Sequence, residues 1–383
     1  MAAKHNLGEN LKRIRKSKGY TQAELAEKIF VTSQALSKWE RGESEPGIGH
    51  IQDLTRILNV SSDALLGIQP NAAPALLAVD GGGTKTEFVL ITPEGQLLKR
   101  LVLPGANPNS SSVRESFQIL SRGIEQMLQT DHRILGIYIG CAGMGSGNNG
   151  TAITKLLCKE YPGILIRCQS DICNILACAE DPDNAIAVIC GTGSVVFGTN
   201  QGKLLRAGGG GWQLDPLGSG YELGRAALSA ALAHADGTGP ETSLTKAVEK
   251  KLGDTVWNCI SRIYSFSPAQ IAEFSYLTTG AWDAGDKVAA EIIEKNCRRL
   301  ADLAKYVSGQ APSAKQILLS GSVLVNCRQF RELLIQMLPK RLKAGCIPCP
   351  PVFGACLECA KLCRLPAPDM EIFVRQYEIE VQR

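Results

Sequence analysis

A glycine-rich turn between two strand-like runs constrains the fold of this chain more than any other feature. The apolar run Ala75–Val79 leads into Asp80-Gly-Gly-Gly-Thr-Lys-Thr86, and a second β-type run follows. Because glycine has no Cβ, three in a row let backbone N–H groups close around phosphate oxygens. Thr84 and Thr86 can donate hydroxyls, and Asp80 can hold a hydrated Mg²⁺. The segment is predicted to be a phosphate-binding hairpin, with a plain β-hairpin as the structural alternative.

Composition places the chain among ordinary soluble proteins. Its 383 residues are 44% hydrophobic and 20% charged, which predicts two or three domains with ample cores. A net charge of +4 selects no class of partner by itself. No apolar run reaches membrane-spanning length, the segment Met1–His5 lacks the apolar core of a signal peptide, and the 14 cysteines are scattered. These features predict a cytoplasmic protein with reduced thiols and no membrane partner.

The N-terminal block has the pattern of a compact helical domain. Apolar residues recur at helical spacing over Leu7–Ile14, Thr21-Gln-Ala-Glu24 is a capping box that begins the next helix, and Thr32 caps a third helix. Two short helices joined by a tight turn form a helix-turn-helix, whose second helix fits a major groove. The basic stretch Lys12–Lys18 is suited to phosphate contact. The residues predicted to face base edges and phosphates are Thr32, Ser33, Gln34, Ser37 and Lys38.

Residues 6–66 strongly resemble the XRE family of lambda-repressor-like DNA-binding domains. The resemblance rests on the runs Tyr20–Ile29, Ser37–Pro46 and Leu58–Leu66. It implies double-stranded operator DNA as a partner and places Gln22 at the phosphate-contacting start of the second helix. Because dimers of such domains read two half-sites, we expect a homodimer and a palindromic operator. The structural alternative is a helical bundle that uses its basic helix for solubility.

Two later segments suit a nucleotide-binding body. The strand-like run Ala185–Cys190 leads into Gly191-Thr-Gly-Ser194, a second hairpin with glycines and hydroxyls. A third strand-like run, 317–320, enters the turn Gly321-Ser322, which can pack its backbone against a nucleoside. Two glycine hairpins in one block predict that phosphates are held from two lobes.

Asp171 is the predicted catalytic residue. It follows the strand-like run 164–168, and a carboxylate at a strand's C-terminal end is well placed to act as a general base. Phosphoryl transfer needs in-line positioning, charge neutralisation and a base for the attacking hydroxyl. The alternative role for Asp171 is to cap the helix expected at 172–179, and one residue can serve both roles.

The segments from about Leu76 to Leu362 together resemble the actin/hexokinase/Hsp70-type ATPases, and within them the BadF/BadG-type ATPases and N-acetylglucosamine kinases. The resemblance implies an all-α helix-turn-helix head followed by an α/β actin-like ATPase body with two ribonuclease-H-like lobes. It implies ATP and Mg²⁺ as cofactors, Mg²⁺ bound by Asp80 through water, and a small amino sugar as a ligand. The nucleotide-binding residues so expected are Asp80, Gly81, Gly82, Gly83, Thr84, Lys85, Thr86, Gly191, Thr192, Gly193, Ser194, Gly321 and Ser322. The sugar-binding residues so expected are Asn107, Asn109, Asp171, Gly193, Gly209 and Asp215.

The segment 208–221 departs from the family pattern. The family reads Gly-Gly-Trp-Gly-x-x-x-Gly-Asp-Glu-Gly-Ser-Gly-Tyr, with the Asp helping to hold the sugar. Ungapped alignment puts Pro216 at that Asp and Leu217 at the Glu, while Asp215 lies one position early and can substitute after a local shift. Catalytic competence and the choice of sugar are therefore open at this point.

Paired Cys-x-x-Cys motifs near the C-terminus offer a metal site as a minor alternative. Cys346 and Cys349 form one pair, and Cys356 and Cys359 form the other. The short gap between the pairs is filled by a Pro-Pro-Val-Phe-Gly-Ala turn that the ATPase resemblance already explains. Cys356, Cys359 and Cys363 share one helical face, as core residues would.

The leading hypothesis for the whole chain is a DNA-binding transcriptional regulator whose sugar-kinase-like, ATP-binding body is the sensor. Its pairing of modules resembles that of the ROK repressors by analogy. The alternatives are an active amino-sugar kinase with an accessory head, and an activase of a 2-hydroxyacyl-CoA dehydratase. The domains so predicted are the head at 1–68, a joint at 69–74, an N-lobe at 75–180, a C-lobe at 181–365 and a tail at 366–383.

Overall fold

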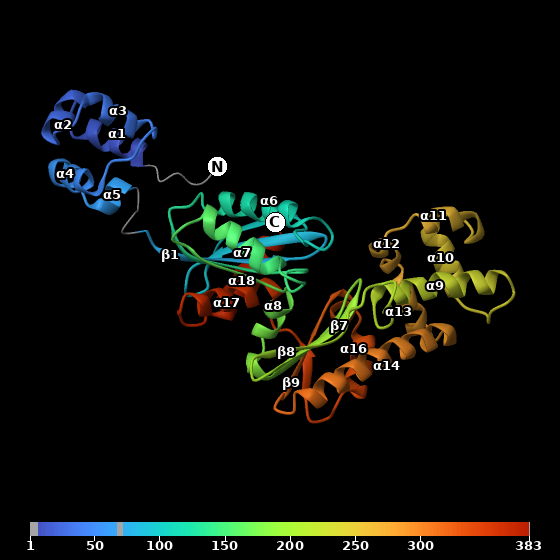
Figure 1. Ribbon diagram of the computed structural model, residues 1–383. Helices are drawn as coiled ribbons and strands as arrows, with labels where there is room; N and C mark the ends of the chain where they lie inside the picture. The colour runs from blue at the N-terminus through green and yellow to red at the C-terminus, as the bar shows by residue number, and fades with distance from the viewer. Residues whose placement is uncertain (1–6, 67–71, 383) are drawn as a thin grey trace. The chain divides into compact units, whose positions relative to one another are not determined.

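The computed structural model describes residues 7–66 and 72–382. Contacts divide the chain into two compact units: one holds the residues up to Gln169 together with those from Cys359 onward, and the other is Ser170–Glu358. The chain therefore passes between the units twice, as the colours of Figure 1 allow the reader to follow. The predicted joint at 69–74 begins outside the described ranges. Within those ranges, no helix is both long and apolar enough to cross a membrane.

Five helices around a single apolar core form the head. Thr21 and Glu24 complete a capping box at the start of the second helix, and Thr32 Oγ1 accepts a hydrogen bond from Ala35 N at 3.1 Å at the start of the third. Both predicted helix starts are thereby confirmed. The helices are α1 (Leu7–Ser17), α2 (Gln22–Lys28), α3 (Ser33–Glu40), α4 (Ile48–Leu58) and α5 (Ser62–Leu66).

One member of the predicted basic stretch is not available to DNA. Arg15 is buried, and its Nε and Nη2 donate to the two carboxylate oxygens of Glu40 at 2.6 and 3.0 Å. Glu40 Oε2 also accepts from Gln22 Nε2 at 2.7 Å, and Arg15 Nη1 donates to Tyr20 O at 2.7 Å. The expectation of a phosphate contact from Arg15 is corrected, because a buried guanidinium needs a carboxylate partner and this one ties α1 to α2 and α3.

Phe30, in the turn between α2 and α3, has a left-handed backbone. Its φ is 57°, and its side chain is 92% exposed. A bulky residue is disfavoured in this region because Cβ crowds the following carbonyl oxygen. The exposed ring buries too little surface to offset that cost.

Replacing Phe30 with glycine is expected to raise the free energy of unfolding of the head by about 1 kcal/mol, because glycine adopts this φ without a steric penalty. Hydrogen exchange of the α2 and α3 amides in the full chain would measure the change. The control is Phe30→Ala, which removes the ring but keeps a Cβ and should gain little. An equal gain in both variants would contradict a backbone origin.

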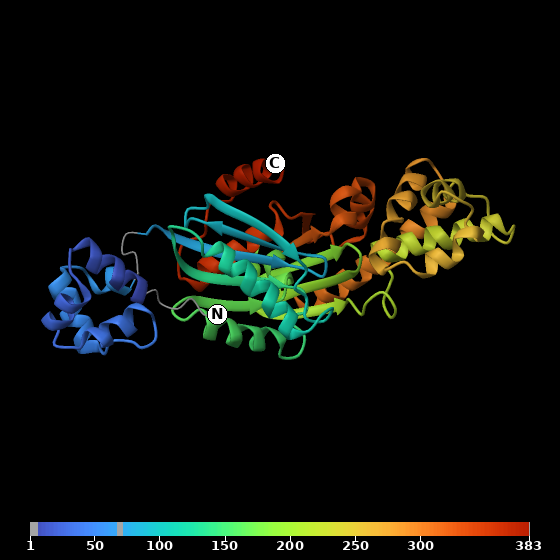
Figure 2. The same ribbon diagram turned by 90° about the horizontal axis from the view of Figure 1, so that it is seen from above.

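The first body sheet has the strand order β3-β2-β1-β4-β5. Its first three strands form an antiparallel meander, and β4 and β5 extend it in parallel with β1. Helices cover both faces of this sheet (Figure 2). On one face, Ile137 of β4 packs into the apolar cluster shared with α6 and α7. On the other face, a Cβ on the preceding Gly136 would lie 2.4 Å from Cys363 Sγ, just after α17. The elements are β1 (Pro74–Gly81), β2 (Lys85–Ile91), β3 (Leu97–Pro104), α6 (Val113–Met127), β4 (Arg133–Cys141), α7 (Asn149–Glu160), β5 (Leu165–Gln169) and α17 (Pro351–Leu362).

The second sheet repeats this topology. Its order is β10-β9-β6-β7-β8, with an antiparallel β6-β7-β8 meander and with β9 and β10 parallel to β6. Two sheets of the same order, each a meander extended by parallel strands, confirm the expected pair of ribonuclease-H-like lobes. The strands are β6 (Ala185–Cys190), β7 (Ser194–Asn200), β8 (Lys203–Gly208), β9 (Gln316–Ser320) and β10 (Lys343–Cys346).

The helix α8 (Ile172–Ala177) belongs to the second unit, although the sequence analysis places it in the N-lobe. Ile172, Ile175 and Leu176 pack against Ala185 and neighbouring residues of the second sheet. The contacts therefore divide the chain before α8, between Gln169 and Ser170, rather than at 180.

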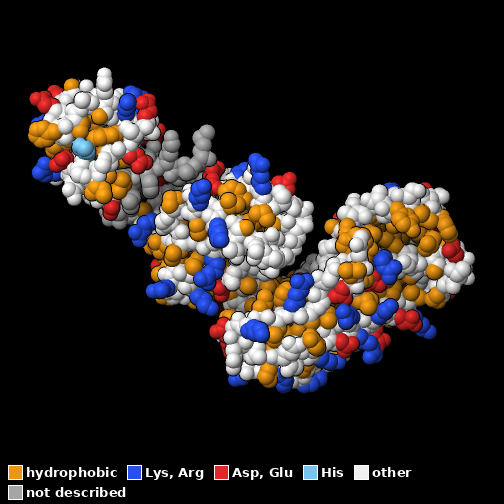
Figure 3. All heavy atoms as spheres, viewed as in Figure 1, with side chains coloured by type: hydrophobic (Ala, Val, Ile, Leu, Met, Phe, Trp, Pro, Cys, Tyr) orange, Lys and Arg blue, Asp and Glu red, His pale blue; other side chains and the backbone are white. Residues whose placement is uncertain are grey.

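The remaining helices are mostly inserted after β8. On the face seen in Figure 3, basic side chains of the long helix α14 are interspersed with acidic ones, as on a solvated surface. The segment expected to be a tail forms α18, whose Phe373 is buried and whose Gln376 Oε1 accepts from Leu97 N at 2.6 Å. The elements are α9 (Gly220–Ala235), α10 (Leu244–Leu252), α11 (Ile260–Tyr264), α12 (Pro268–Ala272), α13 (Ser275–Asp283), α14 (Lys287–Gln310), α15 (Ser322–Asn326), α16 (Arg328–Met337) and α18 (Met370–Gln382), with 3₁₀ turns at Pro182–Asn184 and Trp257–Cys259.

Candidate functional site

The first glycine turn is a tight hairpin with no room for side chains at several of its positions. Gly82 N donates to Lys85 O at 2.8 Å, which closes the turn between β1 and β2. A Cβ on Gly81 would lie 2.5 Å from Cys141 Sγ, and one on Gly105 would lie 2.3 Å from Gly83 O. The hairpin and the segment after β3 can approach so closely only because glycine stands at these positions.

The predicted phosphate contacts of this hairpin differ in accessibility. Gly83, Thr84 and Lys85 are exposed and can reach a ligand. Thr86 is fully buried, and its Oγ1 has no hydrogen-bond partner. The strand β2 is buried on both faces from this residue onward. Asp80 is half-buried at the end of β1.

The asparagines predicted to hold sugar lie next to this hairpin. Asn107 Oδ1 accepts from Asn109 N at 2.9 Å, which closes a local turn. Asn109 donates from Nδ2 to Ser146 Oγ at 2.9 Å and accepts from Asn149 Nδ2 at 3.2 Å. Asn107 is half-buried and Asn109 exposed, so both are accessible from the surface of this unit.

The second glycine turn, between β6 and β7, is held from behind by a helix. Gly191 O accepts from Gly220 N at 2.7 Å, and Thr192 O accepts from Tyr221 N at 3.1 Å. Both carbonyls are thus engaged by the first turn of α9, while Thr192 and Gly193 are exposed. Because these carbonyl oxygens are directed toward α9 and accept hydrogen bonds there, they oppose an anion at the turn less than free carbonyls would. Ser194, also predicted to contact phosphate, is buried and donates from Oγ to Leu217 O at 2.9 Å.

The turn after β9 lies against the second hairpin. Gly321 has a φ of 94°, and a Cβ there would lie 2.4 Å from Cys190 O. The following residue, Ser322, lies beside Gly191, since a Cβ on Gly191 would be 3.9 Å from Ser322 Oγ. Two motifs that are more than a hundred residues apart in the sequence therefore line one site.

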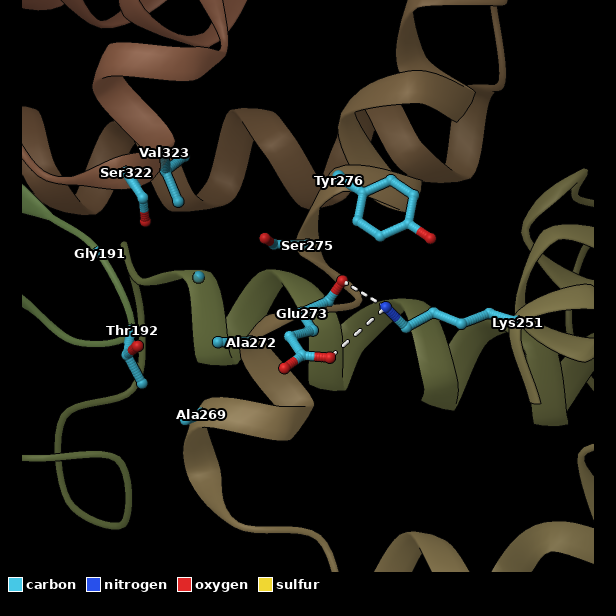
Figure 4. Close-up of a pocket in the computed structure, with 11 residues that line it drawn as sticks. Gly191, Thr192, Lys251, Ala269, Ala272, Glu273, Ser275, Tyr276, Ser322 and Val323 are labelled. Atoms are coloured by element: carbon cyan, nitrogen blue, oxygen red, sulfur yellow. Dashed lines mark hydrogen bonds and ion pairs between the residues drawn. The ribbon is translucent and has the colours of Figure 1, made fainter. Parts of the chain in front are cut away.

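This site is a pocket with a volume of about 320 Å³, open to solvent and contained in the second unit (Figure 4). Its far wall consists of residues that the sequence analysis did not single out. Lys251 Nζ lies 3.1 Å from Glu273 O and 3.8 Å from Glu273 Oε2, and 4.8 Å from the ring centroid of Tyr276. The lining residues are Gly191, Thr192, Gly220, Lys251, Ala269, Ala272, Glu273, Ser275, Tyr276, Ser322 and Val323.

The pocket fits a nucleoside phosphate. A glycine turn with engaged carbonyls forms one end, and an exposed aromatic ring with a lysine and a carboxylate forms the other. Phosphates suit the first environment and a nucleobase the second. No sequence motif marks Lys251 or Tyr276, and only the packing of α10, α12 and α13 brings them to the glycine turn.

Asp171 occupies the N-cap position of α8 without capping it through its side chain. Its Oδ1 accepts from Ser170 Oγ at 3.0 Å. Burial raises the pKa of the Asp171 carboxyl, while hydrogen bonds from Ser170 and from the backbone of Ile172 and Asp171, and last the positive charge of Arg206, oppose that rise. The carboxylate is thus partly buried and is oriented by Ser170 and by the backbone at the start of α8.

The unusual segment after β8 is held by arginines. Arg206 donates from Nε to Gly208 O at 3.2 Å and from Nη2 to Gly209 O at 2.6 Å. Asp215 Oδ1 pairs with Arg299 Nη2 of α14 at 2.9 Å. Asp215, proposed above as a sugar ligand, is therefore already engaged by one oxygen in this conformation. Arg206 was not identified from the sequence, because nothing in its flanking residues marks it.

On the head, the second helix of the helix-turn-helix presents the expected face. Thr32, Ser33, Gln34 and Lys38 are exposed, whereas Leu36 and Trp39 are buried. Ser37, half-buried, accepts from Arg41 Nη1 at 2.5 Å, so Arg41 adds a basic group that the sequence analysis missed.

The cysteines are dispersed in the two units. Cys349 Sγ lies 3.4 Å from Cys178 Sγ, and Cys359 Sγ lies 3.5 Å from Leu77 O, so the two Cys-x-x-Cys pairs have different surroundings. Among the described residues, no group of three or more histidine, cysteine or acidic side chains could hold a metal ion.

The fold and the site together define a class: an actin-like ATPase body carried behind a helix-turn-helix head. The model of the BadF/BadG/BcrA/BcrD ATPase family matches residues 77–356, and a helix-turn-helix model matches residues 11–65. The chain belongs to the BadF/BadG/BcrA/BcrD ATPase family, with an XRE-type helix-turn-helix domain at its N-terminal side.

Individual relatives agree with this assignment. The body is similar to an N-acetylmuramic acid/N-acetylglucosamine kinase of Clostridium acetobutylicum, with 28% identity over 282 residues, which are 69% of this chain and 92% of the relative. The head is similar to the HTH-type transcriptional regulator ImmR of Bacillus subtilis, with 42% identity over 62 residues, 16% of this chain and 49% of that protein. The fold is also that of a proposed N-acetylglucosamine kinase from Porphyromonas gingivalis, with 24% identity, a TM-score of 0.59, and coverage of 73% of this chain and 96% of the other.

Proposed function

We propose that this protein is a DNA-binding transcriptional regulator whose actin-like body senses a small sugar together with ATP. The observation that supports the proposal most is the union, in one chain, of a helix-turn-helix with an exposed second helix and a sugar-kinase-like body with a nucleotide-sized pocket. A dedicated kinase has no need of such a head.

The DNA-binding half of the proposal rests on α3. Its exposed Ser33, Gln34 and Lys38 carry the groups that hydrogen-bond to base edges and phosphates in a major groove. Gln22 is fixed by its bond to Glu40 at the start of α2, where it can donate to a backbone phosphate. Two copies of the chain are proposed to read the halves of a palindromic operator.

The ligand-binding half rests on the glycine turns. We propose that Gly191–Ser194 and Gly321-Ser322 hold ATP in the pocket of the second unit. For the first unit, taken by itself, the exposed Gly83–Lys85 remain proposed phosphate contacts and Asp80 the proposed Mg²⁺ residue through water. Bound ATP would supply the γ-phosphoryl group. Asn107, Asn109, Asp171, Gly193, Gly209 and Asp215 remain the proposed sugar contacts, and an amino sugar is the class we expect.

Sugar and nucleotide together are expected to change the affinity for operator DNA by about 5–150-fold, the usual range of coupling between two sites. The change must be reciprocal, so operator DNA should shift the sugar affinity by the same factor. The measurement is fluorescence anisotropy of the full chain on a duplex selected from a random library. It is run with and without an amino-sugar panel and a non-hydrolysable ATP analogue.

Two glycine variants make this experiment specific. Gly321→Ala forces a Cβ against Cys190 O at a positive φ and should abolish the nucleotide effect. Gly345→Ala places its Cβ in open space and should leave the effect intact. Equal operator affinity under all ligand conditions would contradict the sensor proposal, and no selected duplex at all would contradict the DNA-binding proposal.

A second candidate function is an active ATP-dependent amino-sugar kinase. The observation that favours it is Asp171, whose partly buried carboxylate is oriented by Ser170 at the end of the segment that follows β5. A carboxylate in that state can accept the proton of an attacking sugar hydroxyl. Phosphate transfer from ATP to a hexosamine by the purified full chain tests this candidate directly.

A further inference from the structure

Arg206 is a fixed and exposed positive charge on β8. It projects from β8, and its bonds to Gly208 O and Gly209 O fold the guanidinium back over the following turn. The guanidinium carbon lies 5.6 Å from the ring centroid of Phe197 on the neighbouring strand. An arginine held in this way has lost most of its rotamer freedom before any ligand arrives.

Among the described residues, Arg206 forms no direct ion pair with a carboxylate. Other arginines of this unit are paired with carboxylates, for example Arg225 with Glu222 at 2.7 Å and Arg299 with Asp215 at 2.9 Å. No ion pair within 4.0 Å involves Arg206 in the part of the chain that the structure describes, and its fixed bonds are to neutral carbonyls. Its remaining donors can therefore take an anionic partner.

The position of Arg206 points to the sugar rather than to the nucleotide. The register pairs Gly208 with Val195, which puts the end of β8 beside the Gly191–Ser194 turn. Phe197, which lies under the guanidinium, packs against the cluster that contains Ile172, the residue that follows Asp171. Arg206 is absent from the lining of the nucleotide pocket. It instead supports Gly209, one of the proposed sugar contacts.

We propose that Arg206 binds an anionic substituent of the sugar, so that the ligand of the body is an acidic amino sugar, bearing a carboxylate or a phosphate ester, rather than a neutral one. This inference rests on the proposed function, because it assumes that the body takes a sugar. A guanidinium fork matches both kinds of anion by two parallel hydrogen bonds. The two kinds of ligand therefore share one feature, an oxyanion (planar in a carboxylate, tetrahedral in a phosphate) held near the hydroxyl that accepts the phosphoryl group.

The test is isothermal titration calorimetry of the full chain, saturated with Mg²⁺ and a non-hydrolysable ATP analogue. The probes are N-acetylglucosamine, N-acetylmuramic acid, which adds a carboxylate, and N-acetylglucosamine 6-phosphate, which adds a phosphate. The wild type is expected to bind at least one acidic sugar about ten-fold or more tighter than the neutral sugar. Arg206→Gln should weaken that acidic sugar by about 10–100-fold and the neutral sugar by less than about two-fold. The affinity of Arg206→Lys for the acidic sugar should lie between those of the wild type and Arg206→Gln.

A control variant and two alternative outcomes distinguish binding of the acidic sugar by Arg206 from other roles of this residue. Arg298→Gln removes an exposed arginine that pairs with Glu294 on α14, and should change no sugar affinity. Equal weakening of acidic and neutral sugars in Arg206→Gln would overturn the proposal and assign Arg206 to support of the Gly208–Gly209 backbone. A loss confined to the ATP analogue, with ADP binding unchanged, would overturn it in favour of the γ-phosphate.

The outcome also separates this inference from the sensor proposal. If the wild type binds the neutral sugar tightest and that sugar still alters operator affinity, the Arg206 inference fails while the regulator stands. If no sugar of the panel binds in the presence of the nucleotide analogue, both fail. If acidic sugars bind through Arg206 but leave operator affinity unchanged, only the regulator proposal fails.

Discussion

Replacing Asp171 with asparagine is expected to lower phosphoryl transfer to an amino sugar by about 10²–10⁴-fold, while sugar and nucleotide affinities change by less than about two-fold. Asparagine has the same shape and can keep the bond from Ser170, but it cannot accept the proton of the sugar hydroxyl. Because burial raises the pKa of Asp171, the wild-type rate should fall on acidification at a pH above the ordinary range of an aspartate. That acid limb should be missing from the residual activity of the variant.

Single-turnover kinetics with calorimetric affinities would measure these effects separately. Asp183→Asn is the matched control, since Asp183 is an exposed aspartate of the same unit, away from the glycine turns. An unchanged transfer rate in Asp171→Asn would mean that another group is the base. Absence of transfer in the wild type, with sugar binding retained, would remove the kinase candidate and leave the sensor.

Replacing Glu40 with alanine is expected to lower the free energy of unfolding of the head by about 3–5 kcal/mol, because it leaves the buried Arg15 guanidinium without a counter-charge. It also releases Gln22, whose amide is held by Glu40. Operator affinity should therefore fall even where the head stays folded.

The same ion pair gives the head a defined pH dependence. Burial by itself raises the pKa of Glu40, but the hydrogen bonds from Arg15 and Gln22 outweigh it, so the net pKa is lowered. A lowered pKa in the folded state means that the stabilisation is present above the ordinary glutamate pKa and is lost as the pH falls through the folded value. Acid should thus destabilise the wild-type head more than Glu40→Gln.

Hydrogen exchange of the head amides in the full chain, across pH, would measure both effects. The control is Glu43→Ala, which breaks the exposed pair with Arg41 and should cost less than about 1 kcal/mol. Similar losses of unfolding free energy in Glu40→Ala and Glu43→Ala would show that the buried pair stabilises the head no more than the exposed pair does.

Much of the fold could be predicted from local pattern. Strand runs flanked by glycine turns gave β1, β2, β6, β7 and β9, and capping residues gave the starts of α2 and α3. Local spacing also predicted the exposed face of α3, because a helix of fixed period with a buried Leu36 leaves no other side for Gln34 and Lys38. These features depend on neighbours within a few residues, which a sequence displays.

Other features depend on partners that are remote in the sequence. Arg15 looks like one more basic residue of an exposed helix until Glu40 is brought against it by the packing of α1 on α3. Lys251 and Tyr276 sit in unremarkable helices and enter the pocket only through the fold of the insertion after β8. The sequence presents Thr86 as a possible hydroxyl donor, but the sheet buries β2 on both faces from this residue onward and so keeps the hydroxyl from a ligand.

The discontinuity of the first unit sets the order in which a newly made chain can become functional. The head is complete once Leu66 has emerged from the ribosome, whereas the first sheet still lacks α17 and the buried Phe373 of α18. About 300 residues separate these points, which at about 5–20 residues per second is a delay of about 15–60 s. Nascent chains therefore present a complete helix-turn-helix head well before the first sheet of the body has its last helices.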